Sequence, residues 1–248
     1  MRRPLIIAHR GGRGLAPENT LAACARALRL GVDAIEIDVR LTADDEPVVL
    51  HDATLDRTTT GRGPIAALDA AAVGRLDATV GWHGRGVRPQ PPPLLAEVVA
   101  LVGRRAALHV ELKGDPSVPA ALVERVVRLL RPVDPTPLLL SFDWDALRLA
   151  RRLAPWLPTE PLLDVWPAAA PVLLAELAQA QMDWLGLRYG LASPGRVAAV
   201  QAAGLRLNVW TVNRVPSLAR ALRLNVDAVT TDRPDRLLAV LASRPTSA

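Results

Sequence analysis

The chain has 248 residues, half of them hydrophobic but only 3% aromatic, and a formal net charge of +5. This small positive excess is a weak signal for nucleic acid, so no nucleic-acid partner is expected. Cys24 is the only cysteine, which excludes an internal disulfide, and no apolar run approaches the ~18 residues that a membrane-spanning helix needs. We therefore expect a cytoplasmic protein without stable membrane insertion.

Short β-type runs alternate with longer Ala-, Leu- and Arg-rich stretches of helical period. Eight runs are predicted to be strands, at residues 5–9, 34–39, 107–113, 137–142, 160–165, 183–188, 206–212 and 227–232. Such alternation is typical of a parallel sheet whose strands are joined by helices. Eight strand–helix units in a chain of 248 residues predict an α/β fold of the (β/α)8, or TIM barrel, type, which typically has ~250 residues.

The run PVVLHD at residues 47–52 interrupts this alternation. It follows the second predicted strand too closely for a parallel crossover, which needs ~12 residues or more, so it should return antiparallel. From Ala53 to about Pro93 the periodicity is lost in favour of Gly, Arg, Thr and Pro. We predict one barrel domain over residues 1–248, with a small cap inserted after the second strand at about 45–93.

Polar residues gather where the predicted strands end, which is the edge that carries the active site in such barrels. They are His9, Arg10, Glu36, Asp38, Glu111, Lys113, Ser141, Asp164, Arg188, Trp210, Asn213 and Asp232. Alternate residues of a strand share a face, so Glu36 points with Asp38, and Glu111 points with Lys113. Lys113 is the only lysine of the chain, which indicates a specific role.

Three carboxylates in a half-buried barrel mouth would repel one another unless a cation lay between them. A divalent ion and Lys113 would balance the charge of Glu36, Asp38 and Glu111. Oxygen ligands favour Mg²⁺ or Ca²⁺, with Mn²⁺ as a further candidate, over zinc. The alternatives are an ion pair of Glu36 and Asp38 with Arg40, and a structural salt bridge between Glu111 and Lys113.

His9 and His51 approach this region from separate segments. A pair of imidazoles can remove a proton on one side of a phosphorus atom and supply one on the other. Arg10 offers a forked donor to phosphate oxygens. These residues predict metal-assisted cleavage of a phosphodiester. Asp52 is expected to face away from His51 and to support the turn.

Several segments resemble, in order and spacing, those of the glycerophosphodiester phosphodiesterases, from residue 5 to about 235. They are IAHRGGRGLAPENT, EIDVRLTADDEPVVLHDATLDRTTTG, HVELK, LLSFD, NVWTVN and VTTDRP. The resemblance implies a barrel with a cap after the second strand. It also implies hydrolysis of a small glycerophosphodiester to sn-glycerol 3-phosphate and an alcohol, in which a glycerol hydroxyl attacks phosphorus and water opens the resulting cyclic phosphate.

The resemblance further implies a role for each matched residue. The general acid and base would be His9 and His51. The ligands of the metal would be Glu36, Asp38 and Glu111. The phosphate would be held by Arg10 and Lys113. The glycerol side of the pocket would be lined by Trp210 and Phe142.

Two other functions stay open at this point. A lysophospholipase D-type enzyme would keep the barrel and the metal but would need an apolar groove in the cap for an acyl chain. A non-enzymatic, Arg-rich barrel that binds polyanions would instead show salt-dependent DNA binding. The oligomeric state is not fixed by the sequence, and a homodimer stays open.

Overall fold

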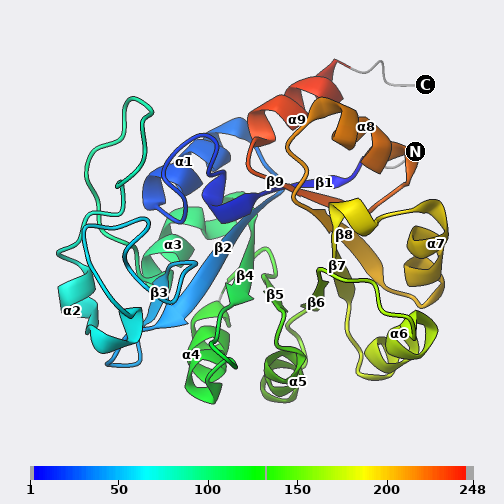
Figure 1. The fold of residues 1–248 in the computed structure, drawn as a ribbon, viewed down its shortest axis with the longest axis horizontal. Helices are drawn as coiled ribbons and strands as arrows, with labels where there is room; N and C mark the ends of the chain where they lie inside the picture. The colour runs from blue at the N-terminus through cyan, green and yellow to red at the C-terminus, as the bar shows by residue number, and fades with distance from the viewer. Residues whose placement is uncertain (1–2, 132, 244–248) are drawn as a thin grey trace.

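The computed structural model describes residues 3–131 and 133–243, and its centre is a closed parallel barrel (Figure 1). Its strands are β1 (Leu5–Ala8), β2 (Ala34–Leu41), β4 (Ala107–Leu112), β5 (Leu138–Ser141), β6 (Thr159–Leu163), β7 (Trp184–Arg188), β8 (Arg206–Trp210) and β9 (Ala228–Thr231). β1 closes the barrel by pairing in parallel with both β2 and β9. The eight predicted strands and the (β/α)8 fold are confirmed.

Helices follow the barrel strands and surround the sheet (Figure 1). They are α1 (Leu21–Leu30), α3 (Leu95–Val102), α4 (Ala120–Leu130), α5 (Trp144–Leu153), α6 (Ala170–Gln179), α7 (Pro194–Ala202), α8 (Val215–Arg223) and α9 (Pro234–Ala242). α1 begins after Thr20, whose hydroxyl accepts a hydrogen bond from the Ala23 N–H, and ends at the left-handed Gly31. None of the described helices combines the length and the apolar character needed to span a bilayer.

The two faces of the barrel strands have different tasks. Residues such as Ile35 and Ile37 on β2 are fully buried and belong to the main cluster between sheet and helices. The inward residues form a smaller apolar cluster that includes Ile7, Leu138 and Trp184. Because this cluster fills only part of the barrel interior, the inward positions near the carboxyl ends of the strands are left to polar side chains.

An insertion follows the second strand, as predicted. β3 (Pro47–Val49) pairs antiparallel with β2, with Val49 opposite Val39. The chain then continues through a 3₁₀ turn (Ile65–Ala67) and the single-turn helix α2 (Ala70–Val73) before α3 begins. We call residues 50–94 the inserted segment. Leu55, Ile65 and Val73 form a small core with Val48 of β3, which is why this segment folds without a helical repeat.

Candidate active site

The pairing of β2 with β4 brings three buried carboxylates together. Asp38 lies opposite Glu111 in the register, and Glu36 lies two residues before Asp38 on the same inward face. Glu36, Asp38 and Glu111 are 2%, 0% and 7% exposed, and each offers an oxygen within 4.8 Å of the others. The predicted acidic cluster is therefore present in the structure.

Neighbouring groups occupy only some of the oxygens in this cluster. The backbone N–H of Arg10 donates to Glu36 Oε2 at 2.7 Å, and Asn19 Nδ2 donates to Asp38 Oδ2 at 2.8 Å. Lys113 Nζ donates to Glu111 Oε1 and lies 3.1 Å from Asp38 Oδ1. Within the described residues, the buried Glu36 Oε1 accepts no hydrogen bond, and the buried Asp38 Oδ1 has only its ion pair with Lys113. Buried oxygens without a donor are what a bound cation would satisfy.

The three carboxyl groups do not share one charge state. Burial, together with the charges of Asp38 and Glu111, raises the pKa of Glu36 well above its usual range. Burial raises the pKa of Glu111 to about 7, with Asp38 adding to the effect and Lys113 opposing it. Burial acts in the same direction on Asp38, but the Lys113 and Arg10 charges outweigh it and hold the Asp38 pKa below its usual range. The cluster thus retains protons that a cation would displace.

Each predicted catalytic histidine is bonded to a carboxylate through Nδ1. His9 Nδ1 lies 2.6 Å from Asp232 Oδ1, and His51 Nδ1 lies 2.6 Å from Asp52 Oδ1. Hydrogen bonds from Arg57 lower the pKa of Asp52 to about 2. An ionised carboxylate accepts its hydrogen bond from the Nδ1–H of the ring, which leaves Nε2 as the nitrogen available for proton transfer.

Our expectation that Asp52 faces away from His51 is wrong. The alternation of side chains holds only within a strand. β3 ends at Val49, so the bends at residues 51 and 52 turn both side chains toward each other. Burial lowers the pKa of His51, although the Asp38 charge acts in the opposite direction. This favours the neutral imidazole, which can accept a proton.

Arg10 stands at the centre of a chain of ion pairs. Its left-handed backbone, with φ of 52°, lets its N–H reach Glu36 while its side chain extends toward Glu18. Arg10 Nη1 donates to Glu18 Oε1 at 2.8 Å, and Arg57 Nη2 donates to the same oxygen at 2.7 Å. Arg57 also donates to Asp52, so one arginine joins the support of Arg10 to the support of His51. Arg57 had no predicted role.

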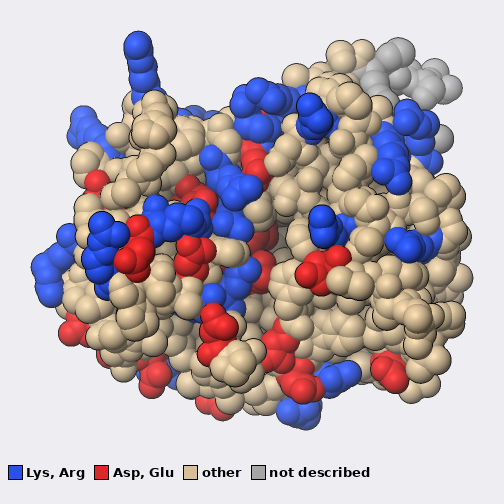
Figure 2. Space-filling view, in the orientation of Figure 1, with Lys and Arg blue, Asp and Glu red and all other residues tan. Residues whose placement is uncertain are grey.

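A cavity of about 190 Å³ lies in the barrel mouth. The sequence-predicted residues along its wall are His9, Arg10, Glu36, His51, Glu111, Lys113, Phe142 and Trp210. Phe142 and Trp210 pack edge to face with ring centroids 5.6 Å apart, and Trp210 Nε1 is buried without a described partner. Figure 2 shows acidic and basic side chains around a hollow near the centre of this face.

Not every polar strand end belongs to the site. Asp164 and Arg188 are exposed and do not line this cavity. The Ser141 hydroxyl donates to the Leu112 carbonyl, which is a structural contact. The alternative pairing of Glu36 and Asp38 with Arg40 is not found among the described residues, and Arg40 Nε donates to the His51 carbonyl instead.

Glu160 is a buried acidic residue that the sequence analysis did not single out. It is fully buried inside the barrel on β6 and accepts a hydrogen bond from Asn208 Nδ2 at 2.8 Å. Burial raises its pKa to about 7, and the nearby Glu111 charge adds to the effect. The sequence pattern that could have indicated Glu160 is a glutamate at an inward-facing position of an otherwise apolar strand. Glu160 stands at the start of this strand, whereas the predicted site residues stand toward strand ends.

Comparisons with known proteins agree with this arrangement. The model of the glycerophosphoryl diester phosphodiesterase family matches residues 9–236. A glycerophosphodiester phosphodiesterase of Caldanaerobacter subterraneus subsp. tengcongensis is 33% identical over 244 residues, which cover 95% of this chain and 97% of the relative.

Solved structures are similar over nearly the whole chain. A phosphodiesterase of Oleispira antarctica, in complex with the product sn-glycerol-3-phosphate, matches with a TM-score of 0.89 and 30% identity over 97% of both chains. A glycerophosphodiester phosphodiesterase of Agrobacterium tumefaciens matches with a TM-score of 0.79 and 30% identity, over 96% of this chain and 100% of that chain. The present chain therefore belongs to the glycerophosphoryl diester phosphodiesterase family of phosphodiester-hydrolysing enzymes.

Proposed function

We propose that the protein hydrolyses small glycerophosphodiesters to sn-glycerol 3-phosphate and an alcohol, with a divalent cation as cofactor. The observation that carries this proposal is the buried cluster of Glu36, Asp38 and Glu111, two of whose members line the same cavity as His9 and His51. The family and the sn-glycerol-3-phosphate complex of the Oleispira antarctica phosphodiesterase support the choice of substrate.

The acidic cluster has the chemistry of a site for Mg²⁺, Ca²⁺ or Mn²⁺. All its donors are oxygens, and one of them, the buried Glu36 Oε1, accepts no hydrogen bond from a described residue. When bound, the ion would draw charge from the phosphoryl oxygens and make phosphorus more open to attack. Lys113, beside Asp38 and Glu111, would place a further positive charge on the phosphate.

The two histidines would move the protons. His51, whose lowered pKa favours the neutral ring, would accept the proton of the glycerol hydroxyl that attacks phosphorus. His9, whose ring the Asp232 carboxylate holds through Nδ1, would give a proton to the alcohol oxygen as its bond to phosphorus breaks. Water would then open the cyclic phosphate with the roles of the two rings exchanged.

The substrate would be held from two sides. Arg10 would direct guanidinium hydrogens at phosphate oxygens from a position that Glu18 and Asp38 fix. The buried Trp210 Nε1–H, which has no described partner, would donate to a glycerol hydroxyl. Phe142 packs on the edge of Trp210 and would cover the carbon atoms of the glycerol.

The alternatives receive less support. A lysophospholipase D-type enzyme needs an apolar groove beside the cap, whereas the cavity there includes the charged side chains of Arg13, Glu18 and Arg57. A polyanion-binding barrel does not explain a buried acidic cluster. The proposed compartment remains the cytoplasm, and a homodimer remains open.

The proposal is tested by release of sn-glycerol 3-phosphate from sn-glycero-3-phosphoethanolamine. We expect EDTA treatment followed by desalting to abolish release, and Mg²⁺, Ca²⁺ or Mn²⁺ to restore it. Glu36→Gln should lower the restored rate at saturating metal, whereas the exposed Glu124→Gln on α4 should match the wild type. Full activity in EDTA, or a wild-type rate and metal requirement in Glu36→Gln, would contradict the proposed metal site.

A further inference from the structure

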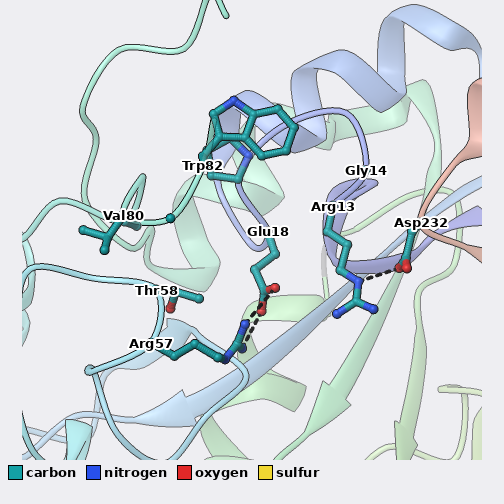
Figure 3. Close-up of a pocket in the computed structure, with 11 residues that line it drawn as sticks. Arg13, Gly14, Glu18, Arg57, Thr58, Val80, Trp82 and Asp232 are labelled. Atoms are coloured by element: carbon teal, nitrogen blue, oxygen red, sulfur yellow. Dashed lines mark hydrogen bonds and ion pairs between the residues drawn. The ribbon is translucent and has the colours of Figure 1, made fainter. Parts of the chain in front are cut away.

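A second cavity, of about 440 Å³, adjoins the active-site cavity. Arg13 lines both cavities and so forms part of the wall between them. The second cavity is open to solvent and is lined by the loop after β1, by Asp232 and by parts of the inserted segment around Arg57 and Trp82. Figure 3 shows Arg13 and Arg57 on opposite sides of this space, with Glu18 between them.

A phosphodiester has two arms, and the barrel mouth offers two adjoining cavities. Under the proposed function, the glycerol arm occupies the smaller cavity beside Trp210 and Phe142. The other arm is the alcohol that leaves with a proton from His9. His9 lines the smaller cavity and Arg13 lines both cavities, so a diester held beside His9 extends past Arg13 to reach the second cavity. The leaving alcohol is therefore placed in the second cavity.

The carboxylates on the wall of the second cavity are already paired. Glu18 accepts from Arg10 and from both terminal nitrogens of Arg57. Asp232 pairs through Oδ1 with His9 and Arg13 and accepts at Oδ2 from Asn213. Neither carboxylate retains an oxygen without a partner that would attract a cationic ligand.

Arg13 is the charged group on this wall that can still bind a ligand. Its side chain is 38% exposed and pairs with Asp232 through Nε, at 2.8 Å. Asp232 is its ion-pair partner among the described residues, and Figure 3 shows this contact at one side of the cavity. Arg57, in contrast, uses its guanidinium on Glu18 and Asp52. Arg13 is thus the positively charged group on this wall that has a single carboxylate partner, while Arg57 has two.

We propose that this second cavity is the subsite for the leaving alcohol, and that Arg13 selects diesters whose alcohol carries a negatively charged group, such as a carboxylate. The inference rests on the proposed function and adds a substrate class to it. A charge-assisted hydrogen bond from the Arg13 guanidinium to the carboxylate supplies the preference.

The test uses two diesters that differ by one carboxylate, sn-glycero-3-phosphoserine and sn-glycero-3-phosphoethanolamine. We expect kcat/KM of the wild type to favour the serine diester by about tenfold, the size of one good charged hydrogen bond. Arg13→Gln should bring the ratio close to one, and Arg13→Lys should retain most of it. Arg62→Gln is the matched control, because Arg62 is on the inserted segment, is 82% exposed and lines neither cavity.

The outcomes separate the two proposals. If the wild type hydrolyses neither diester, the proposed function fails and this inference fails with it. If both diesters are hydrolysed with a ratio near one, or if Arg13→Gln leaves the ratio unchanged, the selection by Arg13 is overturned while the proposed function stands. A loss that lowers both rates by the same factor in Arg13→Gln would show that Arg13 acts through Asp232 alone, which also overturns the inference.

Discussion

Binding of a divalent cation should weaken as the pH falls from 8 to 6. Burial raises the pKa of Glu111 to about 7 and, with repulsion from its neighbours, raises that of Glu36 well above its usual range. Both carboxylates must be ionised to hold a cation, so each retained proton competes with the metal. The affinity is therefore fully expressed above these raised pKa values and is lost as the pH falls through them.

The size of the effect follows from Glu111 alone as a lower limit. With a pKa of about 7, Glu111 is about one-tenth protonated at pH 8 and about nine-tenths protonated at pH 6. The apparent Kd for the cation should then rise about tenfold between these pH values, which corresponds to about 1.4 kcal/mol. Displacement of a proton from Glu36 increases the change further.

Isothermal titration calorimetry with Mg²⁺ measures this linkage directly. Titrations at pH 6, 7 and 8, each in two buffers with different heats of ionisation, give both Kd and the number of protons released. Glu111→Gln should reduce the proton release by about 0.9 at pH 6 and by about 0.1 at pH 8, while the exposed Glu124→Gln should leave it unchanged. An equal Kd at pH 6 and pH 8, without proton release, would refute the reasoning.

Two further predictions concern residues around the acidic cluster. His9→Ala and His51→Ala should each lower kcat by about 10²- to 10⁴-fold while the thermal unfolding midpoint stays close to that of the wild type; a wild-type rate in either variant would exclude that residue as acid or base. Glu160→Gln should keep the contact with Asn208 and remove a pH-dependent cost. Because burial raises the Glu160 pKa from 4.5 to about 7, the neutral form stabilises the fold below pH 4.5 and this contribution is lost as the pH rises through 7. Relative to the wild type, the variant should gain about 3 kcal/mol in unfolding free energy between pH 4.5 and pH 9, measured by urea denaturation. A difference in unfolding free energy between variant and wild type that does not change with pH would contradict the raised pKa of Glu160.

The barrel and its acidic cluster could be predicted because both depend on local periodicity. Glu36 and Asp38 share a face of one strand, and the parallel pairing with β4 brings Glu111 beside them whatever the loops do. The antiparallel return of β3 followed from the short spacing alone. The neighbourhood of Glu111 and Asp38 followed from the expected barrel, in which these two strands end at the same edge.

The remaining features depend on how irregular segments fold. The contact between His51 and Asp52 arises from bends after a strand, where alternation gives no guidance. The cavity beside Arg13 is closed by residues some 40 to 70 positions away in the inserted segment, which has no periodic pattern to place them. The cytoplasmic location and the oligomeric state stay predictions.

The contacts of Arg57 tie reactivity to a part of the chain outside the barrel. Arg57 donates hydrogen bonds to both Asp52 and Glu18. Asp52 in turn is hydrogen-bonded to His51, and Glu18 accepts a hydrogen bond from Arg10. A shift of the loop that bears Arg57 would weaken the support of His51 and of Arg10 at the same time. Replacing this loop with a different one would consequently lower the activity unless the new loop placed a guanidinium group within hydrogen-bonding distance of Asp52 and Glu18.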